Sequence, residues 1–329
     1  MSSLSAFRSL LAAAMCVLAW QAGARAQEAV DYPDRPIRMV VPFPPGSGTD
    51  IVGRLLAQEM SSAWNQPVIV DNRPGASTII GTEIVAKSPP DGYTMIMASN
   101  NHAMNPALFP DSLSFDPRKD FAAVGEVAVL PFILVVNPKL PVTTLDELLA
   151  LARRKPREIT YASTGNGTPP HVAGELLKHM ANVEIVHVPY KGSAAAVTDV
   201  VAGQVSMMFV NVPSAIGLVR AGKLRALAAG TSKRIAMMPE LPTVSELGFP
   251  GFDVSLWMGL LVPAGTPTPV VDKLTREIAV VLDEPTMRAR LAAQGAEPAY
   301  SSPAEFSAFI GDEIKRFARI VNDIDLRVD

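Results

Sequence analysis

Residues 39–54, with the sequence MVVPFPPGSGTDIVGR, join an apolar β-type run to an amphipathic helix through a loop of proline and glycine. Residues without a side chain at such a turn let a ligand approach the backbone closely. The first turn of a helix leaves N–H groups unpaired and carries a partial positive charge, so it favours an anion. The stretch therefore predicts a strand, an anion-binding loop and a helix in succession.

A second unit of the same kind follows about a hundred residues later in the chain. Residues 158–162 read as a strand, residues 163–168 (STGNGT) as a loop, and a helix is expected from Pro170. Two helix ends that favour an anion indicate two lobes that close on one carboxylate-bearing molecule.

The first 26 residues have the pattern of a secretory leader, which predicts a periplasmic location. Arg8 precedes an apolar run at residues 10–20, and residues 24–26 fit a cleavage site that leaves a mature start near Gln27. The run is too short to span a bilayer, although an uncleaved anchor is an open alternative. Cys16 is the only cysteine, so the mature chain is expected to contain neither a disulfide nor a reactive thiol.

The balance of charge argues against a nucleic-acid partner. The 329 residues include 29 Lys and Arg and 32 Asp and Glu; without Arg8 and Arg25 of the leader, 27 and 32 remain, a net charge near −5. The four histidines show no close pair at metal-ligand spacing, and Gly46-x-Gly48 lacks the third glycine of a dinucleotide fingerprint. The sequence therefore predicts no metal and no cofactor.

Alternating strand and helix patterns predict an α/β protein with mainly parallel sheets. Two extended apolar runs, residues 121–137 and 254–262, are expected to be the two chain crossings of a hinge, and residues 267–329 are expected to be helical and to pack on the first lobe. One continuous α/β domain is the open alternative. The expected strands are residues 37–41, 67–71, 93–98, 159–162, 184–188, 205–210 and 224–229, and the expected helices are residues 49–63, 78–87, 170–181, 193–202 and 214–221.

Six ordered motifs extend over nearly the whole mature chain. They are VPFPPGSGTD (41–50), NRPGA (72–76), PDGYT (90–94), HVPYKG (187–192), AGKLRALA (221–228) and PAGTP (263–267). In these motifs the chain resembles the extracytoplasmic solute receptors of tripartite tricarboxylate transporters, the Bug group.

The resemblance implies a two-lobed periplasmic-binding-protein fold of the type II kind, in which a hinge of two crossings joins two mainly parallel sheets flanked by helices. It implies residues 27–130 plus 256–329 as lobe 1 and residues 131–255 as lobe 2. It also implies a monomer that encloses a small organic acid (a mono-, di- or tricarboxylate or an aromatic acid) and presents it to membrane transporter subunits.

Carried over position by position, the resemblance implies that the ligand contacts come from loops at the ends of strands in both lobes. The implied ligand-binding residues are Phe43, Pro45, Gly46, Ser47, Gly48, Asp50, Ser99, Asn100, Asn101, His102, Ser163, Thr164, Gly165, Gly167, Thr168, Tyr190, Lys191, Gly192 and Asn211.

Three departures from the family pattern concern the ligand rather than the fold. Val210 stands where the family usually has an acidic residue, Ser47 where it often has glycine, and Thr168-Pro169 where a serine pair is common. The loss of an acid near the cleft argues against a ligand with an ammonium group, such as an amino acid.

Several of these side chains also fit a purely structural role. Asp50 equally fits a helix cap, and the two glycines of its loop fit turn geometry alone. The same two interpretations apply to His102, Lys191 and His171, whereas Trp257 in the second crossing fits core packing better than ligand stacking.

The predicted function is capture of a ligand without chemistry. A sensory receptor that presents the ligand to a membrane signalling partner is one alternative. An extracytoplasmic hydrolase is the other, although no Gly-x-Ser-x-Gly elbow is present. A hydrolase would need a nucleophile, a base and an orienting acid within reach of one another.

Overall fold

Residues 39–54 fold into a strand, a loop and a helix, as their pattern predicts. The computed structural model describes residues 32–326, in which β1 (Ile37–Val41) leads into α2 (Gly48–Trp64). Val52, Leu56 and Met60 lie on one face of α2 and are fully buried. The predicted leader and its cleavage site lie outside the described residues.

The remaining elements alternate as expected for an α/β protein, and each strand or helix predicted with two bounds has both bounds within two residues of the observed ones. In chain order they are β2 (Val68–Asn72), α3 (Ile79–Ala86), β3 (Thr94–Ser99), α4 (Asn100–Leu108), β4 (Phe121–Val136), α5 (Leu145–Arg154), β5 (Thr160–Ser163), α6 (Pro169–Ala181), β6 (Val186–Pro189), α7 (Ser193–Ala202), β7 (Met207–Asn211), α8 (Val212–Arg220), β8 (Arg225–Ala229), β9 (Ser255–Pro263), α9 (Thr268–Asp283), α10 (Pro285–Ala293), β10 (Glu297–Pro298) and α11 (Pro303–Asp323).

The sheets are parallel at their outer strands and antiparallel where the chain crosses. In the first lobe β1 is parallel to β2 and β3, and in the second β5 is parallel to β6 and β7. β7 and β8 both pair antiparallel with β4 at Ile133, so β4 lies between them. The predicted β-α-β step from residue 205 to residue 229 therefore has a crossing strand inserted between its two strands.

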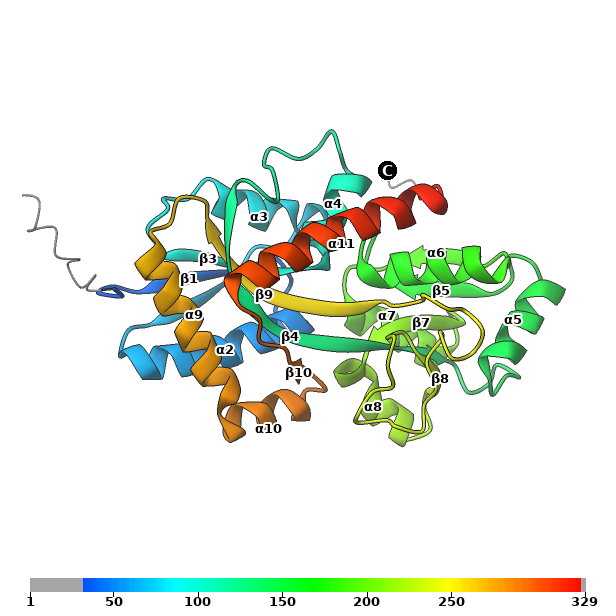
Figure 1. Cartoon of the computed structure of the whole chain (residues 1–329). Helices are drawn as coiled ribbons and strands as arrows, with labels where there is room; N and C mark the ends of the chain where they lie inside the picture. The colour runs from blue at the N-terminus through cyan, green and yellow to red at the C-terminus, as the bar shows by residue number, and fades with distance from the viewer. Residues whose placement is uncertain (1–31, 327–329) are drawn as a thin grey trace, which may run out of the picture. The chain divides into compact units, whose positions relative to one another are not determined.

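Two long strands connect the lobes, as the apolar runs predict. β4 leaves the first lobe and β9 returns to it, so the two pair antiparallel, from Phe121 opposite Pro263 to Pro131 opposite Ser255 (Figure 1). Beyond Pro131, β4 continues into the sheet of the second lobe. The two-lobed fold is confirmed, and the lobe boundaries at residues 130/131 and 255/256 stay a prediction.

Two helices lie where no element was predicted, α4 and α5. The sequence of α4, NNHAMNPAL, has no apolar stripe and contains Pro106, yet most of its residues are buried. Tertiary packing rather than local pattern therefore stabilises it. α5 carries a cap that is visible in sequence, Thr144, whose side chain accepts from the N–H of Glu147.

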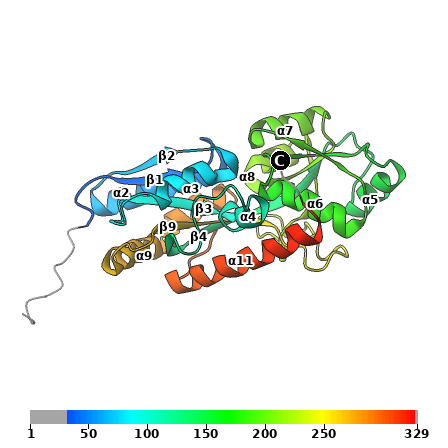
Figure 2. The ribbon, with the colours of Figure 1, turned by 90° about the horizontal axis from the view of Figure 1, so that it is seen from above.

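The C-terminal segment is largely helical, as predicted, and packs on the first lobe. Phe306, Ile310 and Phe317 of α11 join a core cluster with Met104 of α4 and Trp257 of β9. Figure 2 shows α11 running alongside β4 and α4. In residues 32–326, no helix combines the length and the apolar character that a membrane crossing requires.

Candidate functional site

Loops that follow parallel strands meet between the two lobes. Parallel strands end at one edge of a sheet, so the loops after β1 and β3 share an edge, as do those after β5, β6 and β7. The two edges are in contact. A Cβ added to Gly48 would lie 3.5 Å from Nδ2 of Asn211, and the carbonyl of Gly167 accepts from Nδ2 of Asn101 at 3.3 Å.

Asp50 shapes the first loop from within. The residue is only 2% exposed, and its carboxylate accepts from the N–H of Gly46 at 2.8 Å and from Nδ2 of Asn72 at 2.8 Å, and it pairs with Arg54 at 3.0 Å. Burial raises the pKa of this carboxyl, but the hydrogen bonds from Arg54, Gly46 and Asn72 outweigh it and hold the pKa below its usual value. Ser47 caps α2 by accepting from the N–H of Asp50 at 3.2 Å. The geometry favours the structural interpretation of Asp50.

Three hydrogen-bond donors around Gly48 have no acceptor among the described residues. Within residues 32–326, the backbone N–H groups of Gly48 and Thr49 find no acceptor. Asn211 uses its Oδ1 to accept from the N–H of Ser214 at 3.2 Å, whereas its Nδ2 has no acceptor in the same part of the chain. A carboxylate placed here would accept hydrogen bonds from both lobes.

The start of α4 adds buried polar atoms to the site. Oγ of Ser99 and Oδ1 of Asn101 are buried without a hydrogen-bond partner among the described residues. Because buried polar atoms are normally paired, these oxygens suit a ligand hydroxyl or an ordered water. Asn100 differs, since its side chain donates to the carbonyl of Ser255 at 2.8 Å and accepts from the N–H of Trp257 at 3.0 Å. Asn100 therefore ties α4 to β9.

His102 is buried against the core of the first lobe, and its contact with a ligand stays a prediction. Its ring packs edge-on against Phe121, with centroids 5.0 Å apart, and its Nε2 lies 2.7 Å from the carbonyl oxygen of Pro117. Burial lowers the pKa of His102 to about 4, against the hydrogen bond to Pro117, which raises it. The geometry favours a neutral core histidine here.

The second loop differs in its hydrogen bonds from the first, and its role as a second anion-binding helix end stays a prediction. Pro169-Pro170 begin α6, and prolines carry no N–H. The N–H of Gly167 is donated to Nδ1 of His171 at 3.1 Å, and the N–H of Thr168 to the carbonyl of Gly165 at 3.3 Å. Two donors of this segment are thus used inside the loop, whereas the N–H of His171, the third residue of α6, has no acceptor among the described residues.

The hydroxyl of Ser163 is fully hydrogen-bonded within the second lobe. It is fully buried, its Oγ lies 2.6 Å from Nε2 of His187, and it also donates to the carbonyl and accepts from the N–H of Gly165 at 3.0 and 3.1 Å. A hydroxyl has one donor and two acceptor sites, and all three are engaged. The Ser163–His187 contact therefore lacks the free, accessible nucleophile that a hydrolase needs.

The remaining predicted residues come from both lobes. Tyr190 donates its hydroxyl to Asp199 at 2.7 Å, and burial together with this hydrogen bond raises the pKa of Tyr190 to about 12. Gly192, at φ 116°, precedes α7. The others are Thr164 and Phe43, which are half-buried, and Pro45 and Lys191, which are exposed. Their contact with a ligand stays a prediction.

Ser77 lies at the contact between the lobes and was not predicted. Its Oγ donates to the carbonyl of Gly167 at 3.3 Å and accepts from Nδ2 of Asn101 at 2.7 Å. It is the middle of three consecutive residues with positive φ, Ala76 at 45°, Ser77 at 50° and Thr78 at 78°. Such strained backbone clusters at functional sites, but only the motif NRPGA marks the segment in the sequence.

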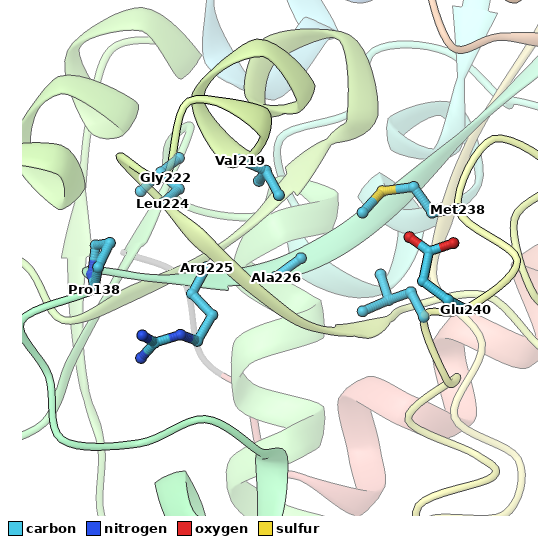
Figure 3. A pocket seen from close by; sticks show the side chains of 9 residues that line it. Pro138, Val219, Gly222, Leu224, Arg225, Ala226, Met238 and Glu240 are labelled. Atoms are coloured by element: carbon cyan, nitrogen blue, oxygen red, sulfur yellow. The ribbon is translucent and has the colours of Figure 1, made fainter.

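A separate pocket of about 340 Å³ lies on the second lobe (Figure 3). Its lining shares no residue with the predicted site and comes from Pro138, Val219, Gly222, Leu224, Arg225, Ala226, Met238, Glu240 and Leu241. The guanidinium of Arg225 is held by the carbonyl of Val142 at 2.5 Å. Among the described residues, no group of three His, Cys, Asp or Glu is placed to hold a metal ion.

Comparison with known proteins identifies the family and the fold. The family described as "Tripartite tricarboxylate transporter family receptor" matches residues 52–326. Protein BugT of Bordetella pertussis (strain Tohama I) is 39% identical over 89% of this chain and 90% of its own. The structure titled "R. palustris Rpa4515 with adipate" superposes with a TM-score of 0.85 at 37% identity, covering 90% of this chain and 99% of the other. MatC (Rpa3494) from Rhodopseudomonas palustris with bound malate gives 0.81 at 33% identity, covering 88% and 100%.

The fold, the strand-end loops and these relatives lead to one conclusion. This chain belongs to the tripartite tricarboxylate transporter receptor family, whose members are periplasmic solute-binding receptors and not enzymes.

Proposed function

We propose that this protein binds the carboxylate of a small organic acid between its lobes and presents the acid to membrane transporter subunits. The observation that carries the proposal is the meeting of donors from the two lobes. The N–H groups of Gly48 and Thr49 come from the first lobe and Nδ2 of Asn211 comes from the second, and a carboxylate offers acceptors to all three.

The strength of such a site is sufficient for a receptor. A hydrogen bond to a charged group contributes roughly 1.5–3 kcal/mol. Three of them, less the cost of ordering the ligand and closing the lobes, are compatible with micromolar affinity, about −8 kcal/mol. The donors are neutral amides, which explains how a chain with a net negative charge binds an anion.

The relatives support a carboxylic acid as the ligand class. Rpa4515 was solved with adipate and MatC with malate, and both are dicarboxylic acids. The unpartnered oxygens of Ser99 and Asn101 would suit a hydroxyl on the acid or a bridging water.

Thermal melting against a panel of acids tests the proposal. The mature protein is unfolded and refolded to remove bound ligand and is then melted with adipate, malate, citrate, benzoate or glutamate. A ligand present at about 100 times its Kd adds about 2.7 kcal/mol, which shifts the Tm by several degrees. A panel without any shift would contradict carboxylate binding.

Export and delivery are part of the same proposal. The leader is expected to be removed near Gln27, which the intact mass of the periplasmic protein tests. Delivery to transporter subunits is tested by uptake of the identified acid in cells with and without the gene. Unchanged uptake would favour the sensory alternative.

A further inference from the structure

Two stacked histidines lie directly beneath the second loop. The rings of His171 and His187 are 3.9 Å apart at their centroids, with planes inclined by 13°. Nδ1 of His171 accepts from the N–H of Gly167 at 3.1 Å, and Nε2 of His187 bonds with Oγ of Ser163 at 2.6 Å. The pair therefore holds the loop at both of its ends.

The hydrogen bond to Gly167 requires an uncharged His171. A ring nitrogen accepts only when it carries no proton, so the proton of His171 must lie on Nε2. A protonated Nδ1 would face the N–H of Gly167 with a second donor, and a charged His171 would also repel a charged His187 at this distance.

The surroundings act in the same direction. Burial, and then the neighbouring His187 and Lys178, lower the pKa of His171 to about 4, although Glu175 raises it. Burial also lowers the pKa of His187. Glu175 is already engaged, because it accepts from the hydroxyl of Tyr161 at 2.6 Å and pairs with Lys178 at 2.9 Å.

Gly167 is also the point where the second loop meets the first lobe. Its carbonyl accepts from Oγ of Ser77 and from Nδ2 of Asn101, each at 3.3 Å. A Cβ on Gly167 would lie 3.0 Å from the ring of Phe109, and its φ of 66° favours glycine. Gly167 thus joins two peptide units, one whose N–H is held by His171 and one whose carbonyl makes the contact with the first lobe.

We propose that His171, stacked on His187, is a positioning residue: as a neutral acceptor it fixes Gly167 so that the carbonyl of Gly167 can bond Ser77 and Asn101 across the cleft. The consequence for ligand affinity rests on the proposed function, whereas the positioning of Gly167 does not.

The first test uses the wild-type mature protein, so folding of a variant is not at issue. ¹⁵N NMR of histidine-labelled protein at pH 7.5 reports which ring nitrogen carries the proton. The expected spectrum shows His171 neutral with its proton on Nε2. A proton on Nδ1, or a doubly protonated ring, would overturn the proposal.

The second test compares two replacements that separate the acceptor from the ring. His171→Asn keeps an acceptor oxygen near the position of Nδ1, whereas His171→Phe keeps the stacked ring and has no acceptor. His179→Asn, on the exposed face of the same helix, is the control. Amide hydrogen exchange of Gly167 in the ligand-free protein and the Kd for adipate are measured at pH 7.5, where the carboxylates of the ligand are ionised.

The expected result is at least tenfold faster exchange and at least threefold weaker adipate binding for His171→Phe, with both values near wild type for His171→Asn and His179→Asn. Equal exchange in both His171 variants, fast or slow, would overturn the role of the acceptor. If wild-type protein bound no acid at all, the proposed function would fail, while the exchange of Gly167 would still decide the positioning role.

Discussion

The imidazole of His171 lies face to face with that of His187, and this stack supports the loop that reaches across to the first lobe. The ring of Tyr161 lies beside this pair, with its centroid 4.9 Å from that of His187 and 6.4 Å from that of His171. The three rings form one aromatic cluster beneath the second loop. In the proposed site, the donor from the second lobe is Nδ2 of Asn211.

Stability is expected to depend on pH through His171. Its pKa is about 4 in the folded protein and about 6.5 when unfolded, so the unfolded chain binds more protons between these values and stability falls as the pH falls through this window. Between pH 7 and pH 4, the free energy of unfolding of the wild type should fall by about 1–3 kcal/mol more than that of His171→Asn. Urea unfolding at several pH values measures this; a constant difference between the two proteins would contradict it.

Glu126 of β4 has the opposite dependence. Burial, and then the nearby Glu313, raise the pKa of Glu126 to about 7, so the folded chain binds more protons between pH 4.5 and 7 and stability is lost as the pH rises through 7. Glu126→Gln should therefore stabilise the protein by about 1–2 kcal/mol at pH 8 and have little effect at pH 5. Melting curves at the two pH values test this, with the exposed Glu297→Gln as control. An equal gain at both values would rule out ionisation as the cause.

Two variants of Asn211 distinguish the effect of charge on ligand binding from the effect of the helix cap on the fold. Asn211→Asp and Asn211→Ser both retain an oxygen that can accept from the N–H of Ser214, but neither keeps the Nδ2 donor. The aspartate also repels a carboxylate. Calorimetric titration with the acid identified in the panel should show about a tenfold loss of affinity for the serine variant, which lacks one hydrogen bond to a charged group, and a larger loss for the aspartate variant. Equal affinities would place the carboxylate elsewhere.

Gly48 is expected to tolerate no side chain when a ligand is bound. A Cβ there would lie 2.8 Å from Cδ2 of Leu130 and would crowd Asn211. Because the end of a leucine side chain can shift, Gly48→Val should retain the fold and lower affinity at least tenfold. Gly217→Ala, on the exposed side of α8 with no atom within 4 Å, is the control. Unchanged affinity of the valine variant would argue against this loop as the anion site.

The variant Gly174→Ala tests how tightly the aromatic cluster of Tyr161, His171 and His187 is packed. A Cβ at this position would lie 2.2 Å from Cε2 of Tyr161, whose ring is held by His187 on one face and by Glu175 at its hydroxyl. Gly174→Ala should destabilise the protein by about 1–3 kcal/mol in urea unfolding. A Cβ at Gly217 would have no atom within 4 Å, so Gly217→Ala should be slightly more stable than wild type because alanine has the higher helix propensity. If Gly174→Ala were as stable as wild type, the ring of Tyr161 would have to shift without cost.

Much of the fold could be predicted because it depends on local patterns. β1 is a short apolar run and α2 carries a helical apolar period, and both patterns lie within a few residues along the chain. By contrast, α4 could not be predicted, since its polar residues Asn100 and His102 are buried by partners more than ten residues away, Ser255 and Pro117. The antiparallel pairing of β4 and β9 follows from the route of the chain between two lobes rather than from either strand.

The candidate site divides in the same way. The loop at Gly48 was predicted because a strand, a glycine turn and a helix start are adjacent in sequence. The absence of N–H groups at the first two positions of α6 was visible in the sequence, because Pro169-Pro170 carry none. The roles of Ser77 and Asn72 had no comparable signal, because their partners Gly167 and Asp50 lie 90 and 22 residues away.

By itself, the sequence determined where backbone donors exist and which of them have a local acceptor: Asp50 accepts from the N–H of Gly46 and His171 from that of Gly167, each four residues along the chain. Tertiary structure alone decided what lies beside the donors that stay free. The N–H groups of Gly48 and Thr49 stay open next to Asn211, which comes from the other lobe. The physical reason is that a hydrogen bond is set by distance in space, and a sequence specifies such distances only for residues within a few positions of one another.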